Sequence, residues 1–332
     1  MSGVQRDLPS GIGVVVIGRN EGERLRRCCE SLAGAAAQVV YVDSGSTDGS
    51  VAMVERMGFA VVELDLNVPF TAGRARNEGF RRLRALVPGL RYVQFLDGDC
   101  TLAAGWLTQA IAFLDAHPGV AVVCGRRRER HPQQSVYNLL CDMEWDTPVG
   151  EAKACGGDAL MRADAFDAAG GFRADLIAGE EPELCVRLRA RGGRIWRLDA
   201  EMTLHDAAMT RFRQWWTRMM RGGYAYAEAA DLHGRPPERQ GVRESRSIWF
   251  WALVVPALAA AVAAFSPAWG AAVLLLYPLQ AARLALRSGP WSAASWYRAA
   301  FLVLGKFPEW LGQLRYLRRR HLGWRAQLIE YK

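Results

Sequence analysis

The sequence predicts an α/β fold with a mostly parallel sheet covered by helices on both faces, followed by a two-helix apolar hairpin and an amphipathic basic segment. Two observations predict the sheet: short apolar runs alternate with helical patterns between residues 13 and 125, and the runs are continuously apolar. A third observation predicts the hairpin: two apolar stretches, 247–265 and 269–286, are each close to the minimum length of a membrane span.

The strands and helices of the predicted sheet follow from this alternation. The expected strands are 13–18, 38–43, 60–64, 92–97 and 120–125, and the expected helices are 21–32, 50–57, 71–86 and 104–116. Beyond residue 126 the pattern is less regular. A helix opening at 180, a strand at 194–198 and a helix around 209–230 are expected there. We place the domains at 1–240, 246–288 and 289–332, with a Gly-, Pro- and charge-rich linker at 231–245.

The charge is concentrated at one end of the chain. The formal net charge is +8, and residues 283–332 alone carry ten basic and two acidic residues, so the rest is balanced. A basic tail that follows an apolar region favours anionic lipid head groups as partners and argues against nucleic acid. Seven cysteines without a Cys-x-x-Cys spacing indicate reduced thiols.

Charge placement also orients the hairpin. Arg243 and Arg246 flank one end of the apolar pair, and Arg283 and Arg287 flank the other, which predicts that both ends face the cytosol. No secretory signal is visible at the start, so the amino-terminal domain is expected in the cytosol, attached to the cytoplasmic membrane. The alternative is a buried soluble hairpin, because alanine is abundant and two prolines interrupt it. The segment 291–320, too charged to span, is expected to lie in the membrane interface.

The predicted strand at 92–97 ends in Asp97-Gly98-Asp99. Because ligands bind outside the carboxyl ends of strands in open α/β sheets, these two carboxylates form a natural seat for a divalent cation that carries a diphosphate. The alternative is an ordinary turn.

Polar residues also follow the two preceding strands. The first strand is followed by Arg19, Asn20 and Glu21, with Asn20 placed as a helix N-cap. The second ends in Asp43, followed by Ser44 and Gly45, and Asp43 can accept a hydrogen bond from a base or a ribose hydroxyl. The alternative for each motif alone is a simple cap.

Arg74, Arg76 and Asn77 occupy the first turns of the predicted helix 71–86. Arginines are locally unfavourable at the positive end of a helix dipole, so an anionic partner such as a diphosphate explains them. A solvated basic face is the alternative.

The motifs GRNE, VDSGSTDG, ARNEGF, FLDGD and GEEPEL, in this order, resemble the family 2 inverting glycosyltransferases of the GT-A fold, which is Rossmann-type. The resemblance covers roughly residues 12–215. It implies a nucleotide-sugar donor, with Asp43 near the nucleoside, Arg74 and Arg76 near the diphosphate, and Asp97 and Asp99 binding Mg²⁺ or Mn²⁺ as the D-x-D motif.

The resemblance also implies an acceptor loop and a general base. The loop would be residues 155–160, with Gly156 and Gly157, and the base would belong to Glu180-Glu181, with Glu181 preferred. Such a base removes a proton from the acceptor hydroxyl as it attacks the anomeric carbon. A charged helix cap is the alternative. His205 lies where members of this fold often place a histidine near the metal, and a packed or solvated histidine is the alternative.

These features predict a membrane-attached, metal-dependent inverting glycosyltransferase that acts on a lipid-linked or cell-envelope glycan acceptor at the inner leaflet. The family's processive Gln-x-x-Arg-Trp motif is absent, which argues against polymerisation. The basic run 125–130 is expected to be exposed, and the alternative is that it holds a phosphate of the acceptor. A nucleotide-sugar nucleotidyltransferase is the alternative enzyme, disfavoured because the first strand lacks a following glycine-rich loop and lysine. An inactive membrane scaffold that binds a nucleotide-sugar is the alternative outside enzymes.

Overall fold

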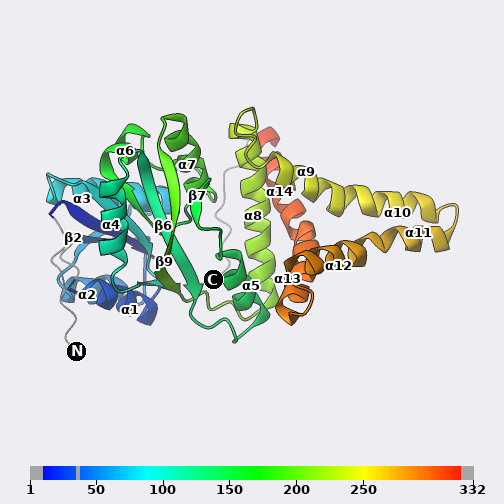
Figure 1. Cartoon of the computed structure of the whole chain (residues 1–332), viewed down its shortest axis with the longest axis horizontal. Helices are drawn as coiled ribbons and strands as arrows, with labels where there is room; N and C mark the ends of the chain where they lie inside the picture. Colours follow the sequence, from blue (N-terminus) through cyan, green and yellow to red (C-terminus); the bar gives the residue numbers. More distant parts are fainter. Residues whose placement is uncertain (1–9, 35–37, 323–332) are drawn as a thin grey trace. The chain divides into compact units, whose positions relative to one another are not determined.

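The computed structural model describes residues 10–34 and 38–322 (Figure 1). These residues form two compact units. The α/β unit comprises the residues up to 131, together with 141–176 and 180–207, and the helical unit comprises 132–140, 177–179 and the residues from 208 onward. The expected domain boundary at 240 therefore differs from the structural division, because the helix that starts at Phe212 belongs to the helical unit.

One sheet of nine strands forms the centre of the α/β unit, in the order β3-β2-β1-β4-β8-β6-β9-β5, with β7 paired to β9. The strands are β1 (Ile12–Gly18), β2 (Gln38–Asp43), β3 (Ala60–Glu63), β4 (Tyr92–Asp97), β5 (Cys100–Leu102), β6 (Val120–Glu129), β7 (Gly150–Ala152), β8 (Ala159–Arg162) and β9 (Arg194–His205). The expected α/β class is confirmed. Strands β3, β2, β1 and β4 are parallel as expected, whereas β8 pairs antiparallel with both β4 and β6, so the sheet as a whole is mixed.

The register of the parallel strands fixes the position of the site. Gly18 lies opposite Asp43, and Ile17 lies opposite Asp97, so the carboxyl ends of β1, β2 and β4 meet at one edge of the sheet. The continuously apolar strands are buried on both faces, as expected for parallel strands between helices.

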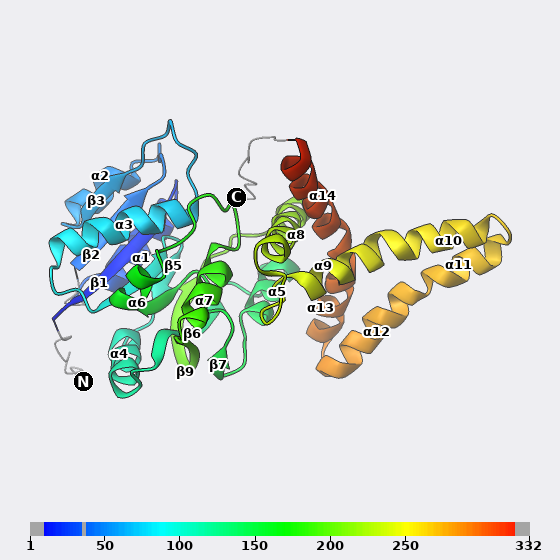
Figure 2. The same ribbon diagram turned by 90° about the horizontal axis from the view of Figure 1, so that it is seen from above.

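Helices cover both faces of this sheet. Helix α3 lies over β1 and β2 on one face, and α1 and α2 lie on the other (Figures 1 and 2). Gly79 allows the close approach of α3, because a Cβ there would lie 2.3 Å from a methyl carbon of Val15. The helices are α1 (Glu23–Leu32), α2 (Ser50–Arg56), α3 (Ala72–Leu86), α4 (Trp106–Ala116), α6 (Ala163–Ala168) and α7 (Glu180–Ala190), and α5 (Val136–Glu144) has residues in both units.

Several predicted element boundaries differ from the structure. The strand expected at 194–198 runs to His205, and two further differences have local reasons. The first helix begins at Glu23 rather than at 21, because Asn20 and Gly22 have positive φ angles of 54° and 49° and form a turn. Asn20 is therefore not an N-cap, and Gly22 takes that position. Strand β6 runs to Glu129, four residues beyond its apolar run, because β9 pairs with it along that length.

The helical unit contains α8 (Phe212–His233), α9 (Val242–Trp249), the π-helical turn η1 (Phe250–Val254), α10 (Val255–Ala263), α11 (Pro267–Leu274), α12 (Leu276–Ser288), α13 (Ala293–Leu304) and α14 (Lys306–Leu322). Helices α8 and α14 cross closely at glycines: a Cβ at Gly223 would lie 1.9 Å from the carbonyl oxygen of Glu309. Tyr224 and Tyr316 pack edge to face at this crossing. One face of the segment expected in the membrane interface is thus covered by α8.

Among the residues that the structure describes, two helices are long and apolar enough to cross a membrane, Val242–Ala263 and Pro267–Ser288. They coincide with the predicted hairpin, and Val242 already belongs to a helix, so the linker is shorter than expected. The π-helical turn η1 and the break between α11 and α12 each lie next to a proline. Pro256 and Pro278 have no N–H group to donate to the carbonyl four residues earlier, so the regular helical hydrogen bonding is interrupted there. At the tip, the side chains of Phe265 and Trp269 are 93% and 70% exposed.

Candidate active site

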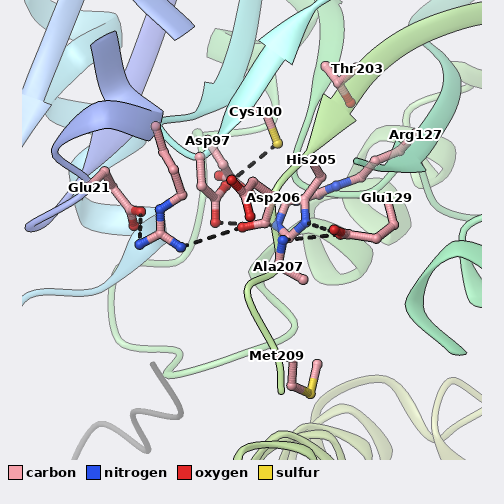
Figure 3. Close-up of polar contacts among 12 residues, drawn as sticks. Glu21, Asp97, Cys100, Arg127, Glu129, Thr203, His205, Asp206, Ala207 and Met209 are labelled. Carbon is pink, nitrogen blue, oxygen red and sulfur yellow. Dashed lines mark hydrogen bonds and ion pairs between the residues drawn. The ribbon is translucent and has the colours of Figure 1, made fainter. Parts of the chain in front are cut away.

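Asp99 and His205 form a buried pair at the sheet edge. Strand β5 pairs antiparallel with β9, so Cys100 lies opposite His205 and brings the neighbouring Asp99 to the imidazole. His205 Nε2 lies 3.3 Å from Asp99 Oδ2. On the other side of the ring, His205 Nδ1 lies 3.3 Å from Glu129 Oε2 (Figure 3). Burial lowers the pKa of His205, but the carboxylates of Asp99 and Glu129 together outweigh it and hold that pKa above its usual value.

These donors fit a divalent cation. Carboxylate oxygens and one imidazole nitrogen suit Mn²⁺, whereas Mg²⁺ is bound mainly by oxygen. Metal-bound histidines almost always give their second ring nitrogen to a carboxylate or carbonyl, and Glu129 occupies that position behind His205. Asp97, two residues from Asp99, offers a partly exposed carboxylate at the same turn.

Two arginines hold the first carboxylate of the motif. Asp97 Oδ1 lies 2.7 Å from Arg76 Nη2, and Asp97 Oδ2 lies 3.4 Å from Arg127 Nη2. Burial raises the pKa of Asp97, but Arg76 and Arg127 outweigh it and hold that pKa below its usual value. The backbone N–H of Asp97 donates to Asp158 Oδ1 at 2.9 Å, and Asp158 Oδ2 accepts from Thr203. Asp97 is therefore a charged group whose present partners can be exchanged for a cation.

The expectation that the basic run 125–130 is exposed holds for Arg128 and is wrong for the other residues of the run. The run continues β6, and alternate residues point to opposite faces. Arg126 is 6% exposed and Glu129 is 3% exposed. Arg127 stacks on the Trp145 ring at 4.8 Å while it contacts Asp97. This part of the strand supplies charged residues to the interior.

Arg76 connects the metal motif to the start of α7. Its side chain is 3% exposed, and its Nη1 donates to Glu180 Oε1 at 2.8 Å while Nη2 contacts Asp97. A Cβ at Gly157 would lie 2.8 Å from Arg76 Nη2, so glycine at this position leaves room for the arginine. The structure thus brings Arg76, Asp97, Gly157 and Glu180 together.

Glu181 lies beside the predicted acceptor loop. Its Oε1 accepts a hydrogen bond from the Cys155 backbone N–H at 2.5 Å and from the thiols of Cys155 and Cys185, each at 3.0 Å. Burial raises the pKa of the Cys155 thiol well above its usual value, so the thiol remains a proton donor. Gly156 follows in the left-handed region, with φ 80°. One oxygen of Glu181 is therefore fixed by three donors.

The polar residues after β1 and β2 are held within their own loops. Asn20 Oδ1 accepts from the Thr47 N–H at 2.7 Å. Asp43 Oδ2 accepts from the N–H groups of Gly45 and Ser46 at 2.8 and 2.7 Å, and its Oδ1 accepts from the Tyr41 hydroxyl. Asp43 and Ser44 are both buried. These contacts shape the loop between β2 and α2.

The remaining predicted residues also have partners within the α/β unit. Arg74 Nη1 donates to the carbonyls of Asp65 and Val68, and Asn77 exchanges two hydrogen bonds with the Phe172 backbone. Arg19 stacks on Phe70, and Glu21 pairs with Arg24 at 2.7 Å. The structure separates Arg74, which binds a loop, from Arg76, which reaches the metal motif.

Residues 13–147 match the profile of Glycosyl transferase family 2. The α/β unit carries a family 2 glycosyltransferase domain of the GT-A fold. A pre-mycofactocin glycosyltransferase of Mycobacterium tuberculosis is 29% identical over 253 residues, which cover 70% of this chain and 50% of that protein. The glycosyltransferase AglE of Haloferax volcanii is 22% identical over 181 residues, 51% of this chain and 58% of that protein. The chain thus spans about half the length of the curated relatives it matches.

Solved structures of this fold resemble the chain over most of its length. The mannosyltransferase PcManGT of Pyrobaculum calidifontis, solved with GDP-Man and Mn²⁺, has a TM-score of 0.63 at 21% identity and covers 92% of this chain and 88% of that one. TarS residues 1–349 of S. aureus have a TM-score of 0.51 at 17% identity, over 94% and 92% of the two chains. At these identities the likeness establishes the fold of the glycosyltransferase domain.

Three site residues of the domain lay outside the sequence-based set: Arg127, Glu129 and Asp158. Arg127 and Glu129 belong to a basic run whose composition is typical of a protein surface. Only the alternation of side chains along a strand would indicate which of its residues point into the interior. Asp158 follows Gly156 and Gly157 in the predicted acceptor loop, and that position was its only sequence signal.

Proposed function

We propose that the chain is a metal-dependent, inverting glycosyltransferase that transfers a hexosyl group from a nucleotide-sugar to an acceptor hydroxyl. The observation that carries this proposal is the buried set of Asp99, His205 and Glu129 beside Asp97, because it offers a cation two carboxylates and an imidazole oriented from behind. The family 2 match and the Mn²⁺ and GDP-Man bound by PcManGT support the same donor chemistry.

Asp97, Asp99 and His205 would hold Mn²⁺ or Mg²⁺. A bound cation neutralises the charge that develops on the leaving diphosphate. Asp97 would then give up part of its pairing with Arg76 and Arg127, which leaves guanidinium groups available to phosphate oxygens. Arg76 and Arg127 are thereby both counter-ions of the motif and diphosphate ligands of the loaded site.

Glu181 would act as the general base. Its Oε1 is occupied by Cys155 and Cys185, so Oε2 is the oxygen available to take the proton of the acceptor hydroxyl. The hydroxyl oxygen then attacks the anomeric carbon as the bond to the diphosphate breaks on the opposite face, which inverts the configuration. Glu180, which is paired with Arg76, is the competing candidate.

We further propose that the two apolar helices, Val242–Ala263 and Pro267–Ser288, attach the enzyme to the cytoplasmic membrane, with the catalytic residues in the cytosol and a lipid-linked or glycan acceptor at the inner leaflet. The exposed Phe265 and Trp269 and the basic residues near the carboxyl end support this proposal. Replacing Phe265 and Trp269 by Ser should weaken partitioning into vesicles without reducing donor hydrolysis.

The decisive experiment uses the full-length protein in lipid with a panel of UDP-, GDP- and dTDP-sugars and measures release of the nucleoside diphosphate. We expect release with one donor class, its loss on addition of EDTA, and its recovery with Mn²⁺. Product NMR should show an anomeric configuration opposite to that of the donor. Nucleotide-sugar binding without any release would instead support the inactive scaffold, and a retained configuration would contradict the role of Glu181.

A further inference from the structure

A polar pocket of about 230 Å³ opens between β6 and β9, apart from the metal motif. It is lined by Arg126, Arg128, Asp146, Arg197, Asp199, Ala200 and Glu201. A bulge in the pairing of β6 with β9 separates Arg197 from Glu201 at this place. The residues that line the pocket are all part of the α/β unit.

The floor and the rim of the pocket differ in burial and in charge. The two buried charged residues, Arg126 and Arg197, are both cationic, at 6% and 3% exposed. The three carboxylates of the lining are exposed and lie at the rim: Asp146, Asp199 and Glu201. Exposed carboxylates can move aside, whereas the buried guanidinium groups are held in place by packing. The buried charged side chains of the lining are therefore both cationic, and one of them, Arg126, is paired with Asp142 and with Asp146 of the rim.

Arg197 is the unexplained group in this pocket. Its Nη1 donates to the Leu198 carbonyl, and its buried Nε has no hydrogen-bond partner. Within residues 10–34 and 38–322, no carboxylate forms an ion pair with it. By contrast, Arg126 pairs with Asp142 at 3.1 Å. A buried charge without a counter-ion is costly, so the fold keeps Arg197 at a cost that an anionic ligand would offset.

Two features of β6 relate the pocket to the candidate active site. Arg127, the neighbour of Arg126, reaches Asp97 on the opposite face of β6. Cys124, which pairs in register with Arg197, is close enough to Glu181 for that carboxylate to contribute, after burial, to raising the pKa of the Cys124 thiol to about 12. The pairing of Arg197 with Cys124 is thus the link between the pocket and the surroundings of Glu181, the proposed base.

We propose that this pocket binds a phosphate group carried by the acceptor, with Arg197 and Arg126 as its ligands. The assignment of the phosphate to the acceptor rests on the proposed glycosyltransferase function, whereas the binding of phosphate does not. Guanidinium groups bind phosphate oxygens through paired, charge-assisted hydrogen bonds, and a tetrahedral anion can accept from two arginines that approach from different strands.

Binding is tested with inorganic phosphate titrated calorimetrically into the full-length protein in detergent, without divalent metal. We expect Arg197→Gln to weaken phosphate binding by about tenfold or more, since a charge-assisted hydrogen bond is lost. Arg197→Lys should retain part of the affinity. The matched control is Arg194→Gln, at an exposed position on the same strand but outside the pocket lining and already paired with Glu151, which should change affinity by less than about twofold. Equal binding by wild type and Arg197→Gln would overturn the site, as would tighter binding of acetate than of phosphate.

Thermal melting separates loss of the ligand from loss of the fold. Without phosphate, Arg197→Gln should melt no lower than the wild type, because the substitution removes an uncompensated buried charge. With phosphate, the wild type should gain stability and the variant should not, because only a state that binds the ligand is stabilised by it. A variant that melts well below the wild type in phosphate-free buffer would contradict the claim that the buried charge of Arg197 has no counter-ion.

The acceptor role is tested with matched pairs, an alcohol and its phosphate monoester in solution, and a lipid alcohol and its phosphate in vesicles. Wild-type kcat/KM should favour the phosphorylated member of one pair by about tenfold or more, and Arg197→Gln should bring that ratio close to one. The pair that shows the preference distinguishes a lipid-borne from a soluble phosphate. Phosphate binding with no preference in either pair overturns the acceptor assignment. Phosphate binding with no transfer to any acceptor overturns the proposed function and leaves the pocket standing.

Discussion

The two halves of the sheet hold their polar residues in different ways. In the parallel half, side chains after β1 and β2 are satisfied by neighbouring backbone: Asp43 binds the N–H groups of its own loop, and Asn20 binds Thr47. In the mixed half, Asp97 and Asp99 are held by ion pairs with residues from distant strands and helices, such as Arg127 and His205.

This difference separates a scaffold from a reactive centre. Side chains that bind backbone N–H groups have no charged partner that a ligand could replace. The loops after β1 and β2 therefore keep the same shape with and without a ligand. Ion-paired side chains can exchange one charged partner for another, and a cation or a diphosphate competes directly for Asp97 and Arg76. Substitutions in the mixed half should therefore change chemistry and metal dependence, whereas those in the parallel half should change mainly loop stability.

The largest effect is expected for Asp99→Ala. The change removes a proposed cation ligand and leaves the imidazole of His205 with the Glu129 carboxylate. Loss of several kcal/mol of charge stabilisation should reduce nucleoside diphosphate release by about 10³-fold or more. Asp164→Ala, at an exposed position in α6, is the matched control and should leave release unchanged. Near-normal release from Asp99→Ala, or from the wild type in EDTA, would show that the metal assignment is wrong.

Glu181→Gln should follow, with transfer reduced on the order of 10²–10⁴-fold because an amide does not accept the proton. The amide oxygen can still accept from the Cys155 N–H, so donor binding, measured by calorimetry, should be retained. Glu180→Gln is the internal comparison, because it weakens the contact with Arg76 but leaves the carboxylate of Glu181 unchanged. A severe loss in Glu180→Gln with intact Glu181→Gln would move the role of base to Glu180.

Glu129→Gln should weaken metal binding by about 10–100-fold, the usual cost of removing an outer carboxylate from a metal-bound histidine. Release should therefore fall at low Mn²⁺ and recover at high Mn²⁺, without a change in the donor KM at saturating metal. Glu201→Gln is the control, because Glu201 forms only an exposed pair with Arg128. A loss that raised Mn²⁺ does not restore would place Glu129 outside the metal centre.

The parallel half was largely predictable from sequence, and the mixed half only in part. Carboxyl ends of neighbouring parallel strands meet at one edge, so Asp43 in the parallel half, and Asp97 at the end of β4 where the two halves join, were placed correctly from strand positions alone. Arg127 and Glu129 were not predicted, because charged residues that follow an apolar run normally lie on the surface. The strand continues through them only because β6 pairs with β9 along this length. The individual partners of Arg76 likewise depend on a register between elements that no local motif encodes.

The smallest effect on turnover is expected for Asn20→Ala, which tests the parallel half. Asn20 has a φ of 54°, and its side chain accepts from Thr47. Alanine loses that hydrogen bond and tolerates this backbone conformation less well, each at a cost of about 1 kcal/mol, which should lower the melting temperature by a few degrees. Asn20→Gly separates the two causes, because glycine removes the hydrogen bond but accepts the positive φ. Release should fall only a few-fold in either variant, and the Mn²⁺ requirement should not change, because Asn20 contacts the loop after β2 rather than the ion-paired cluster. If added Mn²⁺ rescued Asn20→Ala as it should rescue Glu129→Gln, the two halves would share one metal-coupled network, and the distinction between scaffold and reactive centre would fail.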